Sequence, residues 1–90
     1  MHVRFSKKFA KQHEKAEKKI KTAFDEKLEL FLKNPYHPRL NNHQLTGRLK
    51  GSRSINITGD WRAIYSEYRN SNGDNTVVFE LLGTHSQLYK

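Results

Sequence analysis

The sequence predicts an α+β fold, in which a short N-terminal strand and a helical hairpin pack on an antiparallel β-meander. Three observations lead to this prediction. Residues 54–82 contain three runs with the composition of β-strands, separated by turn residues. Residues 7–33 instead carry apolar side chains at spacings of three and four, and neither Gly nor Pro interrupts them. A chain of 90 residues buries a single modest core, so we expect residues 1–90 to form one domain.

The meander is predicted from the second half of the chain. Ser54–Thr58 alternates between polar and apolar residues, as a strand with one buried face does. Trp61–Tyr68 is rich in aromatic and branched side chains, and Thr76–Leu82 has the composition of a strand. Asn70–Asn75 supplies the Asn, Gly and Asp residues that a hairpin loop needs for positive φ. We therefore expect three consecutive strands, each antiparallel to the next.

The first half of the chain is predicted to be mostly helical. His2–Phe5 alternates as a short strand would, and the hydroxyl of Ser6 can cap a helix that follows it. The apolar content is thin in the middle of the helical run, which predicts a turn near Glu14–Glu17 and therefore a helical hairpin. One long helix is the alternative. Pro35 and Pro38 end the helical segment, because proline lacks the amide hydrogen and constrains the residue before it.

The charge distribution points to a polyanionic partner. The formal net charge is +8, from 17 Lys and Arg against 9 Asp and Glu. Between Leu30 and Gly59 there is no carboxylate, although residues 35–53 carry four basic side chains. A basic segment without acids is typical of a surface that binds a nucleic acid or an acidic protein. Within it, Gly47 and Gly51 predict a tight bend, but their spacing does not match a phosphate-binding loop.

Composition also bears on the compartment. Cysteine is absent, which excludes disulfides and thiolate metal sites and favours a reducing compartment. No apolar run approaches the roughly 20 residues needed to span a bilayer, and the first residues carry too many charges for a secretory signal. We therefore expect a cytoplasmic protein with no membrane partner.

The polar side chains suit metal-free cleavage of RNA. None of the five His residues has the short spacing of a metal site, so no metal or other cofactor is expected. Cleavage by a 2′-hydroxyl needs a base, an acid and cations around the phosphate. The candidate acid and base groups are His43, Asp60 and His85, the candidate cations are Arg48, Lys50, Arg53 and Arg62, and the candidate stacking surfaces are Trp61 and Tyr89.

Five of these residues also have simpler interpretations. His43 can be a solvated side chain of a loop, and His85 can merely cap the end of the last strand. Asp60 can be a turn residue between two strands, and Trp61 can belong to the core. Arg62 can pair with Glu80 on the neighbouring strand.

Three motifs resemble a known family. HQLTGRLKGSR, DWRAIY and GTHSQLY, in this order, are similar to the RelE/YafQ branch of bacterial type II toxins, and the resemblance covers essentially the whole chain. It implies a small RelE-like toxin that enters the ribosomal A site and cuts mRNA there. It also implies a cognate antitoxin with an acidic segment that wraps the toxin and, on its N-terminal side, a DNA-binding half.

The resemblance also assigns residues. The functional positions of the family fall on His43, Asp60, Trp61, His85 and Tyr89. At a further position, four residues before the Asp, YafQ-like members typically have a His, whereas this chain has Asn56, which cannot exchange a proton near neutral pH. Asn56 can still orient a phosphate or the 2′-hydroxyl.

These assignments give one mechanistic hypothesis. His85 is the general acid, and either Asp60 or His43 is the base. Arg48, Lys50 and Arg53 bind phosphates, while Trp61 and Tyr89 position bases. Two alternatives stay open: a non-catalytic basic module that binds RNA or an acidic partner, and a ribonuclease that acts on free RNA.

Overall fold

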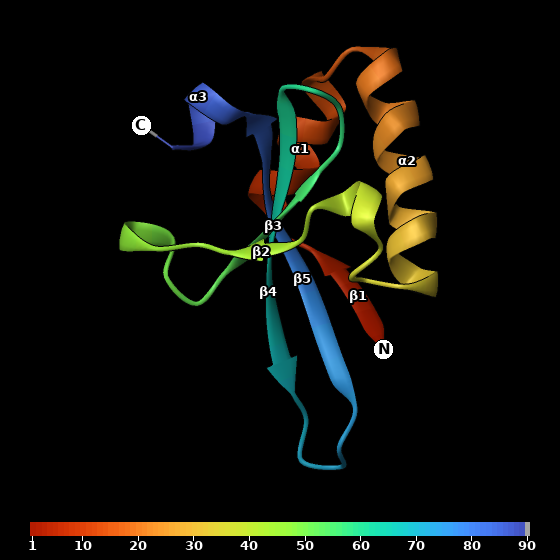
Figure 1. The fold of residues 1–90 in the computed structure, drawn as a ribbon, viewed down its shortest axis with the longest axis vertical. Coiled ribbons are helices and arrows are strands. Elements are labelled where there is room, and N and C mark those ends of the chain that lie inside the picture. Colours follow the sequence, from red (N-terminus) through yellow and green to blue (C-terminus); the bar gives the residue numbers. More distant parts are fainter. Residues whose placement is uncertain (90) are drawn as a thin grey trace.

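The computed structural model describes residues 1–89 and has an α+β fold, as predicted (Figure 1). A five-stranded sheet carries helices α1 and α2 on one side, and a short helix α3 lies on the other. The elements are β1 (His2–Phe5), α1 (Lys7–Lys15), α2 (Lys18–Lys33), the 3₁₀ helix η1 (Pro38–Leu40), β2 (His43–Gln44), the 3₁₀ helix η2 (Gly47–Leu49), β3 (Arg53–Asn56), β4 (Trp61–Arg69), β5 (Asn75–Thr84) and α3 (His85–Leu88). Within residues 1–89, no helix has the length and apolar character needed to cross a membrane.

The sheet contains the predicted meander and two further strands. Its strand order is β1-β5-β4-β3-β2, and β3, β4 and β5 are each antiparallel to the next. β1 lies at one edge, parallel to β5, with His2 opposite Thr76 and Phe5 opposite Phe79. β2 lies at the other edge, antiparallel to β3. Sequence reasoning placed β2 in a loop, because two residues are too few to show the alternation of a strand.

A β-bulge sets the pairing of β4 with β5. Ile64 lies opposite Leu81 but Tyr65 lies opposite Phe79, so Glu80 is the extra residue on β5. Arg62 therefore lies opposite Gly83, and the predicted pairing of Arg62 with Glu80 is wrong. Its guanidinium instead turns back along its own strand, where Nη1 donates to the backbone carbonyls of Thr58, Gly59 and Trp61 at 3.0, 3.2 and 3.0 Å.

The predicted helical hairpin is confirmed. Ser6 caps α1, since its hydroxyl accepts a hydrogen bond from the Phe9 amide at 2.9 Å. Ala16 and Glu17 both have extended backbone, with ψ near 150°, and separate α1 from α2. One continuous helix is thereby excluded. α2 ends at Lys33, just before Pro35.

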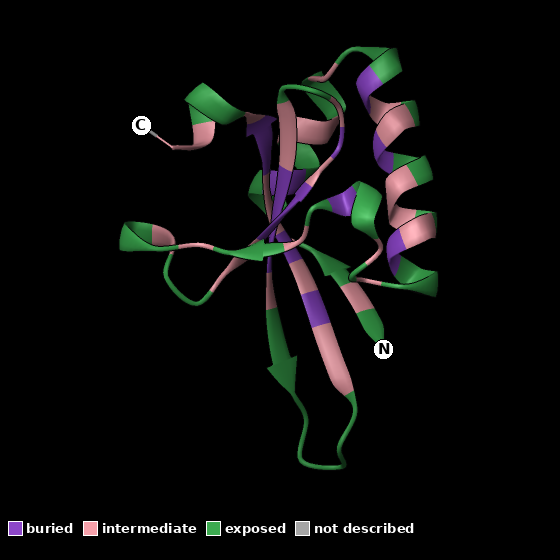
Figure 2. Ribbon diagram, viewed as in Figure 1, coloured by how far each residue is buried: buried purple, intermediate pink, exposed green. Residues whose placement is uncertain are grey.

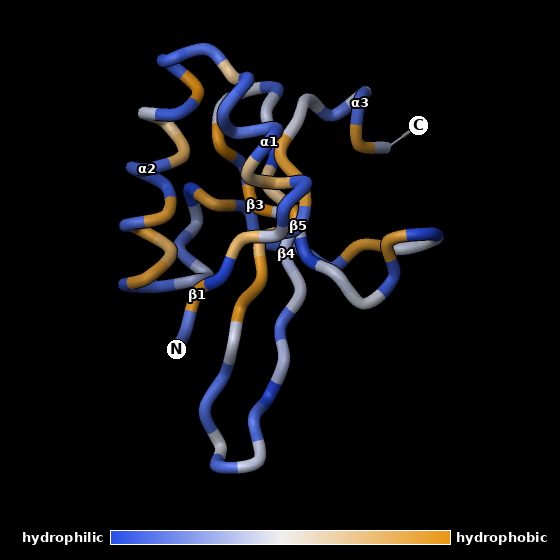
Figure 3. Tube along the Cα trace, turned by 180° about the vertical axis from the view of Figure 1, so that it is seen from behind, coloured by the Kyte–Doolittle hydropathy of each residue, from blue (hydrophilic) through white to orange (hydrophobic). Residues whose placement is uncertain are grey.

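The core lies between the sheet and the helices. Phe79 is fully buried at its centre, and its ring contacts those of Phe9, Phe24, Phe31 and Tyr65 at centroid distances of 5.5–5.8 Å. Figure 2 shows buried residues of α2 where it faces the strands, and Figure 3 shows hydrophobic stretches of α2 on the side toward the strands. Trp61 is half-buried and packs against this core from its edge.

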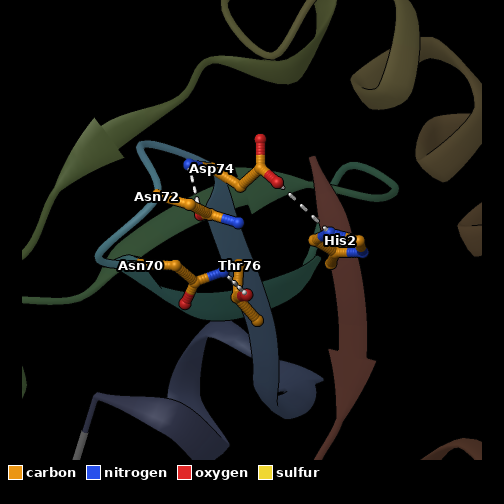
Figure 4. Close-up of polar contacts among 5 residues, drawn as sticks. All are labelled: His2, Asn70, Asn72, Asp74 and Thr76. Carbon is orange, nitrogen blue, oxygen red and sulfur yellow. Dashed lines mark hydrogen bonds and ion pairs between the residues drawn. The ribbon is translucent and has the colours of Figure 1, made fainter.

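The β4–β5 hairpin extends beyond the core as an exposed arm (Figure 2). Its loop falls at the predicted place, and Gly73 adopts a φ of +91° there. Figure 4 shows the polar contacts of this loop: Asn70 donates to Thr76 Oγ1 at 3.3 Å, and the Asp74 amide donates to Asn72 at 3.1 Å. His2 Nε2 lies 3.9 Å from the Asp74 carboxylate, so the N-terminal strand is also in contact with the loop.

Candidate active-site cleft

The face of the sheet away from α2 is partly covered by α3. Thr84 and Gln87 form a capping box: the Gln87 amide donates to Thr84 Oγ1 at 3.3 Å, and the Thr84 amide donates to Gln87 Oε1 at 2.9 Å. Leu88 then packs over Gly83, where a Cβ would lie only 3.2 Å from Leu88 Cδ2. The segment that the sequence predicted as a tail is therefore a short helix held on the sheet.

An open cleft of about 400 Å³ lies between residues 41–46 and α3. We call it the histidine cleft. Its lining consists of Asn41, His43, Gln44, Leu45, Thr46, Arg62, His85 and Tyr89. The cleft therefore brings together four of the predicted site residues, from β2, β4 and the α3 segment. None of the lining residues within the described part of the chain carries a carboxylate.

His43 is held in a defined tautomer. Its Nδ1 lies 2.8 Å from the backbone carbonyl of Asn41. A carbonyl only accepts hydrogen bonds, so Nδ1 carries the hydrogen and the neutral ring has its lone pair on Nε2. Asn41 follows η1 in the left-handed conformation, with φ +45°, which directs its carbonyl at the ring. The arrangement leaves Nε2 as the atom able to take up a proton.

His85 and Tyr89 form the opposite part of the lining. Their ring centroids lie 4.6 Å apart in an edge-to-face arrangement. The Tyr89 hydroxyl donates to Ser54 Oγ at 2.9 Å, and Ser54 is completely buried in β3. The backbone amide of His85 donates to the carbonyl of Asp60 at 2.9 Å. The Tyr89 ring is thus anchored on β3, and the backbone of His85 is held at the bend before β4.

The remaining predicted site residues lie elsewhere. Asp60 is exposed on the bend before β4 and does not line the cleft. Asn56 lies opposite Arg62 in the sheet, and its Oδ1 is buried without a hydrogen-bond partner within residues 1–89. Trp61 alternates with Arg62 along β4 and points to the core side instead.

The predicted cations are spread over three clefts. Arg62 lines the histidine cleft, and Arg48 lines a neighbouring cleft of about 470 Å³. Lys50 and Arg53 line a third, of about 530 Å³. There the Arg53 guanidinium lies 5.3 Å from the centre of the Tyr36 ring.

Asn42 is a positioning residue that sequence reasoning missed. Its Oδ1 accepts from Arg53 Nε at 2.7 Å, and its Nδ2 donates to the Tyr65 hydroxyl at 2.7 Å and to the Pro35 carbonyl at 2.9 Å. Burial raises the pKa of the Tyr65 phenol, and the hydrogen bond from Asn42 opposes that rise. Because His43 directly follows Asn42, these bonds also fix the start of the cleft wall. An Asn in a polar loop carries no signal of this role.

Comparison with known proteins identifies the family. Residues 1–90 match the family described as bacterial toxin of type II toxin-antitoxin system, YafQ. The chain belongs to the YafQ toxin family. The resemblance read from its three motifs is therefore confirmed. Within residues 1–89 of this YafQ-family chain, no three His, Cys, Asp or Glu side chains are placed to hold a metal ion together.

Solved structures agree with the family assignment. The crystal structure of YafQ from E. coli strain BL21(DE3) is 25% identical, with a TM-score of 0.79 over 98% of this chain and 97% of that one. A crystal structure of the E. coli DinJ-YafQ toxin-antitoxin complex is 25% identical, with a TM-score of 0.76 over 98% and 96%. The YoeB/ParE toxin from Agrobacterium tumefaciens, at 15% identity, shares the fold, with a TM-score of 0.75 over 94% and 99%. No curated protein sequence matches this YafQ-family chain.

Proposed function

We propose that this YafQ-family chain is a ribosome-dependent, metal-free endoribonuclease that cleaves mRNA in the ribosomal A site. The observation that supports this most strongly is the histidine cleft, which holds His43, His85 and Arg62 together with no carboxylate from residues 1–89 in its lining. Two imidazoles facing one open cleft can supply both proton transfers of the reaction. The proposed cleavage takes place on translating ribosomes, so the proposed location of the protein is the cytoplasm.

The reaction assigns one role to each histidine. Nε2 of His43 takes the proton of a 2′-hydroxyl, and the 2′-oxygen attacks the adjacent phosphorus. The bond from phosphorus to the 5′-oxygen of the next nucleotide breaks, and His85 gives that oxygen a proton. The products are a 2′,3′-cyclic phosphate and a free 5′-hydroxyl. Arg62 contributes positive charge beside the phosphate, where it stabilises the developing negative charge.

The geometry favours His43 over Asp60 as the base. His43 lines the cleft and presents Nε2, whereas Asp60 lies outside the lining and contacts His85 through its backbone carbonyl. Asp60 then acts as a positioning residue for α3. Tyr89 supplies a rigid ring on which a base can stack, because its hydroxyl is anchored on Ser54.

A cognate antitoxin is part of the proposal. With a net charge of +8, this chain has a basic surface that an acidic segment can cover by charge complementarity. The E. coli structure with the same fold is a complex of the toxin YafQ with DinJ. We propose that the antitoxin of this chain is likewise acidic and carries a DNA-binding half.

The first test is inducible expression in bacteria of the wild type, His85→Ala and His2→Ala. His2 is exposed at the far end of the hairpin arm, so its substitution removes an imidazole away from the cleft. Wild type and His2→Ala are expected to arrest growth and to produce new in-frame mRNA ends by primer extension, and His85→Ala to do neither. If the folded, soluble wild type is harmless and no cuts appear, the catalytic proposal is wrong.

Asn56 bears on the outcome in which the folded wild type makes no cuts. Asn56 stands where YafQ-like members typically have a His, and its Oδ1 has no partner in the described residues. A chain that binds RNA or an acidic protein without cutting is the alternative function. Cleavage of naked RNA as fast as ribosome-bound mRNA would instead indicate a ribonuclease that acts on free RNA.

A further inference from the structure

A second cleft adjoins the histidine cleft. It has a volume of about 470 Å³, within the range of about 300–1,000 Å³ typical of ligand sites. We call it the lysine cleft. Its lining consists of Lys8, Gln12, Thr46, Arg48, Leu49, Leu81, Gln87, Leu88 and Tyr89. Thr46 and Tyr89 line both clefts, so the two clefts are neighbours with these side chains at their boundary.

The lysine cleft combines basic and apolar side chains. Among residues 1–89, Lys8 and Arg48 line it and no carboxylate does. Lys8 takes part in none of the three ion pairs found within residues 1–89. Leucine side chains from η2, β5 and α3 complete the lining, which suits the face of a nucleobase.

Lys8 is held at the cleft by its helix. One turn further along α1, Gln12 accepts a hydrogen bond from the Leu82 amide of β5 at 2.8 Å. Residues four apart lie on the same face of a helix, so Lys8 and Gln12 both face the sheet edge. The ammonium group is therefore attached to a fixed backbone, while its flexible stem lets it follow a phosphate.

We propose that the lysine cleft is a subsite for the nucleotide next to the cleavage point, and that Lys8 binds a backbone phosphate of that nucleotide. The strand passes from the histidine cleft over the Tyr89 ring into the lysine cleft. Arg48 contributes further positive charge, and the base rests on the leucine side chains. This inference rests on the proposed function in one respect: it assumes that the RNA strand bound in the lysine cleft is the strand that is cleaved.

The test compares Lys8→Gln with Lys11→Gln, both in the His85→Ala background to prevent cleavage. Lys11 lies on the same helix but outside both cleft linings, so the two variants lose the same charge. Affinity for a short oligouridine is measured at several salt concentrations. Lys8→Gln is expected to weaken binding several-fold and to reduce the slope of log K against log salt by about 0.7, the value for one phosphate contact on a single strand. Lys11→Gln should change neither.

Phosphate replacement then identifies the contact. A neutral methylphosphonate is placed at each position of the oligouridine in turn. At one position of the oligouridine, the replacement should weaken binding by the Lys11→Gln variant but not by the Lys8→Gln variant. Equal binding by both lysine variants at every position would overturn the inference. The inference would also be wrong if the two variants differed in affinity for an acidic peptide but not for RNA, because the cleft would then bind a protein partner.

Activity on ribosomes separates this inference from the proposed function. With an intact His85, Lys8→Gln should raise KM for mRNA cleavage several-fold and leave kcat nearly unchanged, since a flanking contact contributes to binding rather than to proton transfer. Wild-type cleavage with no effect of Lys8→Gln on KM would refute the subsite alone. Lys8-dependent RNA binding without any cleavage would instead refute the enzyme and keep the subsite.

Discussion

Replacing Asn42 by Ala tests how the wall of the histidine cleft is held. The substitution removes three hydrogen bonds and leaves the hydroxyl of Tyr65, a residue only 2% exposed, without its Asn42 partner. Leaving a buried polar group unsatisfied costs about 1–3 kcal/mol, and the lost bond to the half-buried Arg53 adds about 1 kcal/mol. We therefore expect the free energy of unfolding to fall by about 2–4 kcal/mol.

The protein should survive this loss. At about 0.05–0.15 kcal/mol per residue, a chain of 90 residues has a total stability of about 5–13 kcal/mol. With a urea m-value of about 2 kcal/mol/M, the expected loss moves the unfolding midpoint down by about 1–2 M. Cleavage measured below the transition should fall as well, because His43 directly follows the substituted residue.

A double-mutant cycle with Tyr65→Phe checks the cause. Tyr65→Phe alone removes the hydroxyl itself and should cost about 1 kcal/mol, since Asn42 keeps its bond to Pro35. In the double variant no hydroxyl is left to be buried unpaired. The sum of the stability losses of the two single variants should therefore exceed the loss measured for the double variant by at least 1 kcal/mol. Effects that add to within about 0.5 kcal/mol would refute the reasoning.

Three further predictions concern the core, α3 and alkaline pH. Phe79→Ala should lower the free energy of unfolding by about 3–5 kcal/mol in urea titrations, because a fully buried ring that contacts five other aromatic rings is lost. Gly83→Val should displace α3 and reduce cleavage about 10–100-fold, since the new side chain meets Gln87 and Leu88 within 3.2 Å; Gly59→Val, with open space around it, is the control and should cleave like wild type. The raised pKa of Tyr65 means that the folded state holds the phenolic proton more tightly than the unfolded state. The contribution of this proton to the free energy of unfolding is therefore fully present below about pH 10, and it is lost as the pH rises through the folded-state pKa. Stability measured from pH 9 upward should fall less steeply in Tyr65→Phe, and identical curves would contradict this.

Local signals predicted most of the secondary structure. The Ser6 cap and the Asn- and Gly-rich hairpin loop act within a few residues, and both are confirmed. The break between α1 and α2 also shows locally, as a stretch poor in apolar residues. The capping box of α3 was present in the sequence as well, in Thr84 and Gln87, but the helix is too short to show a periodicity.

What sequence reasoning missed depends on distant partners. Neither the parallel pairing of β1 with β5 nor the two-residue β2 has a local signal, because each is defined by its neighbour in the sheet. The bulge at Glu80 likewise has no local signal, and it changes which residue of β5 lies opposite Arg62. The candidate site divides in the same way. The sequence named His43, Arg62, His85 and Tyr89, but only the fold shows that these four meet in one cleft while Arg53 is bonded to Asn42 outside it.

The order in which the chain is synthesised has a consequence for the cell that makes it. The first strand, β1, pairs with residues 76–79, and the histidine cleft needs Arg62, His85 and Tyr89 in addition to residues 41–46. A nascent chain of 80 residues has no α3 and therefore no complete cleft. Under the proposed function, the ribosome that translates this chain is not exposed to an active enzyme until residues 85–89 have been added and folded back on the sheet. Under this proposal, a nascent chain that stops before His85 lacks the general acid and cannot cut RNA.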